Sequence, residues 1–237
     1  MSAVASLFPY AEISRHGEVL LAGVVGSTAY GLAQEGSDED RLGVFAAPTM
    51  SLLGLTEARE SRVYSEPCDA AFHEARKYLR LALACNPTIT ELLWLDNHEV
   101  RSPLGEALVA IRARLLSSGR VRDSYLGYAR SQLKRLETRG DGTFSSNTAN
   151  RSAKHARHMA RLLEQGYALY TTGEFSVRVA DPQWYHDFSA QGPDVWAEWF
   201  HREAERFEAA QSCLPEDPDI AVASDWLLRV RRRYWSD

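Results

Sequence analysis

The segments Gly26–Gly31 and Ser37–Asp40, which read GSTAYG and SDED, decide the fold that this sequence predicts. Glu18–Gly26 is rich in Val and Leu, which predicts a buried strand. Asp38–Ala46 predicts a second strand that starts with acidic residues. The chain therefore opens with two strands that are joined by a Gly-Ser turn and a polar loop.

Two aspartates lie one pleat apart at the start of the second predicted strand. Because side chains alternate between the faces of a strand, Asp38 and Asp40 should project to one side, and Glu39 and Arg41 to the other. Two such carboxylates repel each other unless a hard divalent cation lies between them. A D-x-D pattern alone is common in solvated loops, and it is the preceding turn that makes this pair informative.

Gly26 and Ser27 have the features of a phosphate-binding turn. Glycine permits unusual backbone angles and the close approach of a ligand. Ser27 is suited to be the N-cap of a helical turn through Gly31, whose first amides would attract an anion. The Ser27 hydroxyl can also donate to a phosphate oxygen. The turn and the carboxylates together suit attack on the α-phosphorus of a nucleoside triphosphate.

A third carboxylate is needed to hold two metal ions and to activate the incoming hydroxyl. The candidates are Glu66, Asp69 and Glu74. Asp69 is preferred because it lies in strand-like sequence just before a helix, where a neighbouring strand of the sheet would end.

In the rest of the chain the sequence predicts only one more region of strand and many helices. Residues 62–72 predict strand material that is interrupted near Pro67, and residues 2–14 predict a short helix. Further helices are expected at His73–Ala84, Pro87–Leu95, Leu104–Ser117, Arg120–Thr138, Thr148–Thr172, Pro193–Cys213 and Ile220–Trp235, with breaks at Gly140–Gly142 and Gly173–Gln191. The predicted class is α+β, with a small mixed sheet in a catalytic domain of residues 1–103 and an all-helical domain of residues 104–237.

The composition is that of a globular protein, but the charge is uneven. The 237 residues are 45% hydrophobic and 25% charged, with a net charge of −5 that argues against a surface built for DNA. Residues 110–165 contain twelve Lys or Arg and four acidic residues, a net charge of +8, so the rest of the chain carries −13. This distribution suits metal-binding carboxylates that face phosphate-binding groups, and solvated helix faces are the alternative.

The sequence also predicts a cytoplasmic protein without a membrane partner. Its three cysteines, Cys68, Cys85 and Cys213, form no C-x-x-C pair, which fits a reducing compartment. The apolar run Val19–Val25 is too short to span a bilayer.

The motifs resemble those of the DNA polymerase β superfamily of nucleotidyltransferases. Within it, they resemble the predicted nucleotidyltransferases of the RNA-repair-associated, YcgL-like group. The matching motifs are Gly26-Ser27-x-x-Tyr30-Gly31, Ser37-Asp38-x-Asp40-x-x-Gly43, Asp69, Asn86-Pro87-Thr88-x-x-Glu91-Leu92, the helix with Lys154, His155, Arg157 and His158, and Gly173-Glu174-Phe175. The resemblance extends from about Leu20 to about Val179, and no motif matches Asp194–Asp237.

The resemblance assigns roles to these residues one by one. Gly26 and Ser27 would hold the triphosphate. Asp38 and Asp40 would bind two magnesium ions, with Asp69 as the third acid. Glu39 departs from the group, which often has an aromatic or neutral residue there, but it faces away from the predicted site.

Two further sets of residues have both a functional and a structural interpretation. Lys154, Arg157, His158 and Arg161 share one face of the predicted helix and would bind phosphates of the nucleotide, or they form a solvated basic face. Glu91 is interpreted as structural. The core of the helical domain is expected to contain Trp184, Tyr185, Trp196, Trp199 and Trp226, with base stacking as the alternative.

The sequence therefore predicts a transferase that moves a nucleoside monophosphate from a nucleoside triphosphate such as ATP to a hydroxyl and releases pyrophosphate. The acceptor could be an RNA or tRNA end, a protein or a small molecule. The alternative is a catalytically silent nucleotide-binding module with the same fold.

Overall fold

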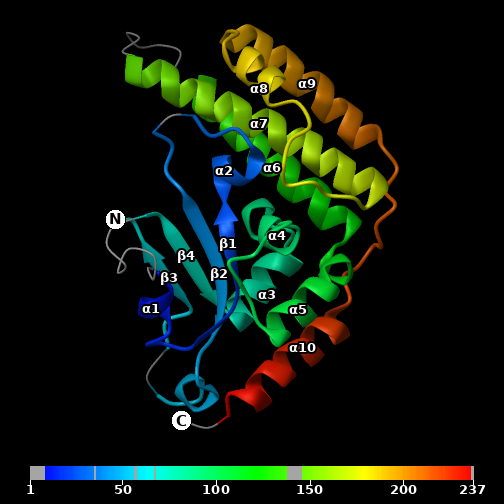
Figure 1. Ribbon diagram of the computed structural model, residues 1–237. Helices are drawn as coiled ribbons and strands as arrows, with labels where there is room; N and C mark the ends of the chain where they lie inside the picture. Colours follow the sequence, from blue (N-terminus) through cyan, green and yellow to red (C-terminus); the bar gives the residue numbers. More distant parts are fainter. Residues whose placement is uncertain (1–8, 35, 56–57, 67, 138–145, 236–237) are drawn as a thin grey trace. The chain divides into compact units, whose positions relative to one another are not determined.

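The computed structural model describes residues 9–34, 36–55, 58–66, 68–137 and 146–235 (Figure 1). The chain forms two compact units. The sheet unit consists of Met1–Ala84, Thr88–Leu116 and Pro218–Asp237, and the helical unit of Cys85–Pro87 and Ser117–Asp217. The predicted α+β class is confirmed. The units differ from the predicted division after residue 103, because residues 104–116 and 218–237 group with the sheet and residues 85–87 with the helices.

A mixed five-stranded sheet forms the centre of the sheet unit, with the order β3-β4-β2-β1-β5. β2 pairs with β4 in parallel, and the other neighbours are antiparallel. The strands are β1 (Glu18–Val25), β2 (Asp40–Ala46), β3 (Ser61–Tyr64), β4 (Ala70–Glu74) and β5 (Val100–Arg101). β2 therefore begins two residues later than predicted, at the second aspartate of the SDED segment.

The two faces of the sheet are covered differently. Leu42, Val44 and Ala46 of β2 pack in one core with residues of α3 (Ala75–Leu83), α4 (Pro87–Leu93), α5 (Pro103–Ala110) and α10 (Ile220–Arg233). Phe45 and the short α1 (Tyr10–Ile13) belong to a second core on the opposite face. The period-two alternation of β2 thus separates a helix-covered face from a thinner one.

Local signals in the sequence place the ends of these helices. Glu74 caps α3 by accepting from the amide of Arg76 at 2.9 Å. Ser102 caps α5 by accepting from the amide of Gly105 at 3.1 Å, with Pro103 in the first turn. The sheet unit also contains α2 (Gly26–Tyr30) and the 3-10 helices η1 (Thr49–Leu52) and η2 (Arg112–Leu115).

The last helix, α10, is fixed to the sheet unit by polar and apolar contacts. Trp226 is buried there, and its indole Nε1 donates to the carbonyl of Leu104 at 2.9 Å. The prediction that Trp226 belongs to the core of the helical domain was therefore wrong. Arg231 forms two hydrogen bonds with the carboxylate of Glu74, at 2.6 and 2.9 Å. Glu74 is 1% exposed, so this charge is neutralised within the core.

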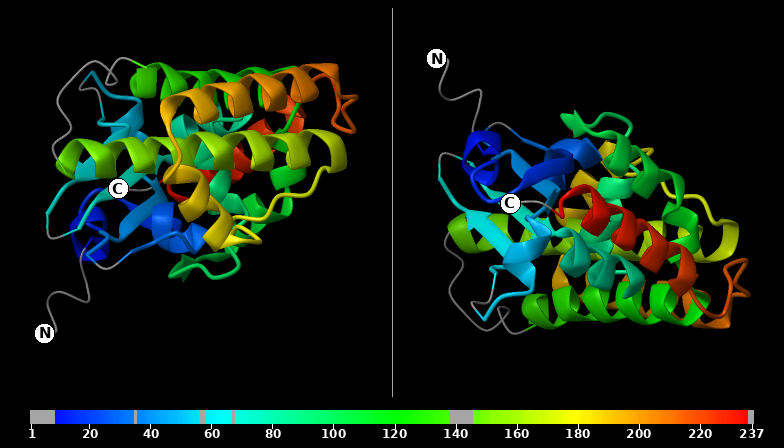
Figure 2. Two further views of the ribbon diagram at one scale, coloured as in Figure 1. Left: turned by 90° about the horizontal axis from the view of Figure 1, so that it is seen from above. Right: turned by 90° about the horizontal axis from the view of Figure 1, so that it is seen from below.

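The helical unit is built on two long helices that pack along each other, α6 (Ser118–Glu137) and α7 (Ser146–Thr172) (Figure 2). α8 (Pro182–Ser189) and α9 (Pro193–Ala209) pack against them. α8 lies in the region predicted as a break, although Asp181 accepts from the amide of Trp184 and Pro182 starts the helix, which is a recognisable N-terminal signal. Tyr185, Trp196 and Trp199 are buried in this unit, as predicted, and Trp184 is half-buried there.

Most of the other predicted elements agree with the structure apart from their ends, but the single helix predicted at Leu104–Ser117 is divided into α5 and η2. β5 was not predicted, because two residues leave no periodicity. The predicted interruption at Pro67, the break at Gly140–Gly142 and the first part of the helix at residues 2–14 lie outside the described residues. Cys68, Cys85 and Cys213 are free thiols. None of the helices in the described part of the chain is long and apolar enough to cross a membrane.

The pair of Arg231 and Glu74 gives a prediction about stability. Replacement of Arg231 by glutamine should lower the free energy of unfolding by about 3 kcal/mol, because it leaves a buried carboxylate without its cation. The exposed neighbour Arg232 is the control, and Arg232→Gln should stay within about 0.5 kcal/mol of the unmodified chain. Urea denaturation of the full chain measures both variants, and equal midpoints would contradict the assignment.

Candidate active site

The bend after β1 lies directly against the start of β2. Val25 is paired with Asp40 at the end of the antiparallel ladder. Gly26 follows with a φ of +71°, and a Cβ atom added to it would lie 2.4 Å from the Oδ2 atom of Asp40. Only glycine fits at this position, both for its backbone angle and for the proximity of the carboxylate.

The helical turn after this bend differs in one detail from the prediction. α2 begins at Gly26 with Val25 as its N-cap, so Ser27 is inside the first turn and is not its cap. The carbonyl of Ser27 accepts from the amide of Leu32 at 2.9 Å. Gly31 ends the turn with a φ of +76°, as predicted. Ser27 is half-buried and lies next to the glycine that contacts Asp40.

Asp69 lies beside Asp40 on the neighbouring parallel strand. β4 pairs with β2 so that Ala70 is opposite Arg41, and the amide of Arg41 donates to the carbonyl of Asp69 at 2.8 Å. Residues that are neighbours across a parallel pair share a face of the sheet. The register therefore places Asp40 and Asp69 at the same end of the two strands and on the same face of the sheet. Asp40 is half-buried and Asp69 is exposed.

The remaining acids fall in different places. Asp38 is exposed and precedes β2 by two residues. Glu74, one alternative for the third acid, is occupied by Arg231 and by the cap of α3. Glu66, the other alternative, is exposed in the segment between β3 and β4. Among the described residues, no three His, Cys, Asp or Glu side chains lie together closely enough to hold a metal ion by themselves.

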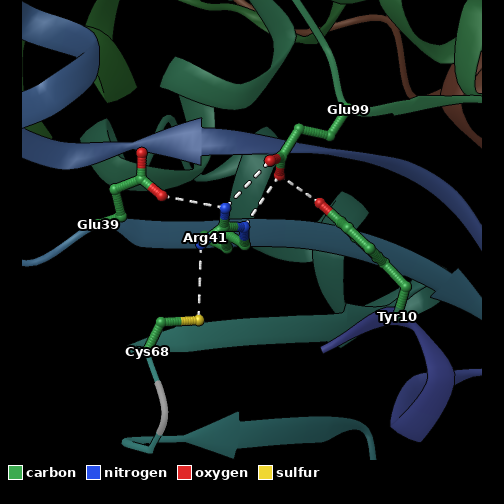
Figure 3. A network of polar contacts seen from close by, with 5 residues as sticks. All are labelled: Tyr10, Glu39, Arg41, Cys68 and Glu99. Atoms are coloured by element: carbon green, nitrogen blue, oxygen red, sulfur yellow. Dashed lines mark hydrogen bonds and ion pairs between the residues drawn. The ribbon is translucent and has the colours of Figure 1, made fainter. Parts of the chain in front are cut away.

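A polar network lies at the same end of these strands, on the opposite face of the sheet (Figure 3). Arg41 donates to Glu39 at 3.1 Å, to both carboxylate oxygens of Glu99 at 3.1 and 3.2 Å, and to the sulfur of Cys68 at 3.6 Å. The hydroxyl of Tyr10 donates to Glu99. Burial lowers the pKa of Arg41, but the hydrogen bonds and charge of Glu99 outweigh this effect and raise it.

This network was not predicted beyond the direction of Glu39 and Arg41, which the structure shows pointing to the same side (Figure 3). Glu99 is 58 residues from Arg41, and no local pattern signals such a pair. Arg41 and Cys68 are chain neighbours of Asp40 and Asp69, so the network holds the backbone that carries both aspartates.

Two of the recognised motifs meet in one buried contact. The hydroxyl of Tyr30 lies 2.6 Å from each carboxylate oxygen of Glu91. Glu91 is fully buried in α4, in line with the structural role predicted for it. The contact connects α2, which carries Ser27, to α4.

The basic residues of α7 belong to the helical unit. Lys154 is exposed, and Arg157 is half-buried and donates to the hydroxyl of Ser189 at 2.9 Å. Burial, followed by the charge of Arg161, lowers the pKa of His158 to about 3, so this imidazole is neutral. Arg161 is 1% exposed and donates to Gln165 at 2.6 Å, so it is not part of a solvated basic face.

The carboxylates predicted to bind metal are of the chemical type that a hard divalent cation takes, and Asp40 and Asp69 lie at the start of neighbouring strands at the same end of the sheet. Asp38, Asp40 and Asp69 offer carboxylate oxygens, which are the ligands that Mg²⁺ prefers. The space that a Cβ at Gly26 would fill is bounded by the carboxylate of Asp40, so the turn and the acid are within contact of each other. The arrangement suits chemistry on a phosphate that is held at the turn.

Comparisons with known proteins give a family for most of this chain. The model of a family described as the RNA repair pathway DNA polymerase beta family matches residues 3–181. Among solved structures, a nucleotidyltransferase-like protein from Exiguobacterium sibiricum 255-15 is similar at 12% identity and a TM-score of 0.31, over 98% of this chain and 77% of that chain. The comparison with curated proteins gives no significant match.

The contact between Tyr30 and Glu91 is expected to stabilise the sheet unit. Tyr30→Phe removes the hydroxyl that bonds to a buried carboxylate, and the free energy of unfolding should fall by about 2 kcal/mol. Tyr128→Phe is the control, since its hydroxyl bonds to Asn86 at an exposed position and its loss should cost less than about 0.5 kcal/mol. Chemical denaturation followed by tryptophan fluorescence compares the two, and a smaller loss for Tyr30→Phe would refute the expectation.

Proposed function

This chain belongs to the RNA repair pathway DNA polymerase beta family, and from that membership we propose that it is a magnesium-dependent nucleotidyltransferase. It transfers a nucleoside monophosphate from a nucleoside triphosphate, with ATP as the first candidate, to a hydroxyl group and releases pyrophosphate. The observation that carries the proposal is the position of Gly26, where the carboxylate of Asp40 occupies the space next to the bend.

The acids divide the work of the reaction. Asp38, Asp40 and Asp69 would hold two magnesium ions, which would supply charge stabilisation for the entering and leaving oxygens. The acceptor hydroxyl attacks the α-phosphorus, and its proton passes to the carboxylate of Asp69. The bond between the α-phosphorus and the bridging oxygen breaks, and pyrophosphate leaves.

The donor phosphates are assigned to two groups of residues. Gly26 allows the triphosphate to approach the backbone, and Ser27 donates its hydroxyl to a phosphate oxygen. Lys154 and Arg157 are proposed to bind the β- and γ-phosphates as cations. His158 would contribute as a neutral hydrogen-bonding group, because its pKa lies far below neutral pH.

An RNA or tRNA end is the preferred acceptor. The description of the family refers to RNA repair, and residues 110–165 carry a net charge of +8 that suits a polyanion. A protein or small-molecule hydroxyl is the alternative. Incubation with each α-phosphate-labelled nucleoside triphosphate, magnesium and total RNA, followed by separation of labelled products, identifies donor and acceptor together. We place this reaction in the cytoplasm.

The carboxylates give a direct test of the mechanism. Asp38→Asn and Asp40→Asn should each lower the rate of transfer at least about 10³-fold, equivalent to about 4 kcal/mol, because the metal-binding charge is lost. Asp69→Asn should lower kcat more than it raises KM, since Asp69 accepts the proton. Release of labelled pyrophosphate measures all three variants.

Glu39→Gln is the matched control, because Glu39 lies between Asp38 and Asp40 but points to the opposite face of the sheet (Figure 3). It should retain activity within about threefold. Full activity of Asp38→Asn and Asp40→Asn would end the proposed mechanism. Triphosphate binding without turnover in the unmodified chain would favour the catalytically silent module.

The bend gives a second test, which does not alter any charged group. Gly26→Ala places a Cβ atom against the carboxylate of Asp40 at a positive φ, and it should lower the rate of transfer at least about 100-fold, equivalent to about 3 kcal/mol. Gly54→Ala is the control, because nothing lies within 4 Å of the added atom and activity should be unchanged. Equal activity of the two variants, measured by the same pyrophosphate assay, would separate the bend from the reaction.

A further inference from the structure

A second candidate site lies in the sheet unit, at the end of the β1–β2 ladder that is remote from Asp40. A cavity of about 690 Å³ is lined by residues from the start of β1, the end of β2, the segment that leads into β3, and Tyr234 after α10. This volume falls in the range of pockets that bind small molecules. Ala46 in the cavity wall is six positions after Asp40 in β2, which corresponds to about 20 Å along the strand.

Cationic side chains dominate the polar part of this wall. Arg15, Arg59 and Arg62 all line the cavity, and Glu18 is the acidic residue in the same lining. Arg15 is paired with Glu12 at 3.1 Å. Within the described part of the chain, no acidic side chain forms an ion pair with Arg59 or Arg62.

Arg62 is the residue whose surroundings are incomplete. Its Nε atom is buried and has no hydrogen-bond partner among the described residues. A buried guanidinium nitrogen without a partner is costly. Arg62 also lines the cavity, so the charge of its guanidinium group acts on an anion that enters there. Arg59 is exposed in the same lining and can reach such an anion without unfolding any element.

The pKa of His16, which lines the cavity, is affected by the arginines around it. Burial lowers its pKa most, and the charge of Arg62 lowers it next. Glu12 has the opposite effect, and Arg15 and Arg59 lower the pKa by smaller amounts. The three arginines are therefore close enough to act on one imidazole from different elements.

We propose that this basic pocket, defined by Arg15, His16, Arg59 and Arg62, binds the phosphate group of a small phosphorylated molecule. Arg59 and Arg62 provide charge-assisted hydrogen bonds to the phosphate oxygens. The site is separate from Asp40 and Asp69, and it does not depend on the proposed transferase reaction.

The rest of the lining indicates a ligand larger than the phosphate itself. Phe45, Ala47 and Pro48 give the cavity an apolar side. Glu18 interacts with the hydroxyl of Tyr234, whose pKa is raised to about 12 by burial and by this carboxylate. Glu18 accepts hydrogen bonds and repels anions, so it suits the hydroxyl groups of a sugar phosphate.

Isothermal titration calorimetry without magnesium tests the site, with inorganic phosphate and ribose 5-phosphate as separate probes. Both should bind, and ribose 5-phosphate more tightly. Arg59→Gln and Arg62→Gln should each weaken binding about tenfold, because each removes a charge-assisted contact. Arg62→Lys should bind more tightly than Arg62→Gln, which distinguishes loss of charge from a disturbed fold.

Arg229→Gln is the matched control, since it removes an exposed positive charge from α10 outside the cavity lining. It should bind like the unmodified chain, as should Asp40→Asn. In the same samples, NMR titration of His16 should show its pKa rising by about 1 when a probe binds, because an anion stabilises the imidazolium form.

Three results would overturn the proposal. The first is the absence of saturable binding of either probe at millimolar concentration. The second is an equal loss of affinity in Arg59→Gln and Arg229→Gln, which would indicate a diffuse charge effect. The third is an unchanged pKa of His16 at saturation, which would place the bound anion elsewhere on the chain.

Discussion

The register between β1, β2 and β4 is the constraint on which the candidate site depends. It places Gly26, Asp40 and Asp69 side by side at one end of strands β1, β2 and β4. A shift of β2 by one residue would turn Asp40 to the opposite face and place Arg41 against the bend. The bond network of Arg41 opposes such a shift, because it engages Glu99 and Cys68 from the thinner face of the sheet. The sheet therefore positions its carboxylates by interactions on the side where no chemistry is proposed.

Local sequence patterns were sufficient for the parts of the fold that depend on neighbouring residues. The bend, the alternation along β2 and most helices follow from periodicity and from glycine, proline and capping residues. The contacts that close the structure were not accessible in this way. The bonds from Arg41 to Glu99 and from Tyr30 to Glu91 join residues 58 and 61 positions apart, and neither partner has a neighbour that signals the other. The start of β2 at Asp40 is likewise set by its pairing with Val25.

Glu74 and Trp226 show why sequence order is a poor guide to the division of this chain. A buried carboxylate or indole N–H that lacks a hydrogen-bond partner destabilises the fold. Glu74 is paired with Arg231 of α10, and Trp226 of α10 donates to the carbonyl of Leu104 in α5. α10 thereby completes the core that β1 and β2 begin, after the chain has formed the whole helical unit. Glu74 is thus explained by packing, which leaves Asp69 as the acid whose strand register points to Asp40.

The two ends of β2 carry opposite requirements for a phosphate ligand. At the Asp40 end the carboxylates repel a phosphate, so the proposed binding there would need divalent cations and its affinity would depend on magnesium. At the Ala46 end the guanidinium groups of Arg59 and Arg62 line the cavity, and their charge would attract a phosphate directly. About 20 Å of strand separates these environments, which is more than a Debye length at physiological ionic strength. The two sites can therefore have independent electrostatics within one small sheet, and magnesium dependence is the property that distinguishes a ligand bound at one end from a ligand bound at the other.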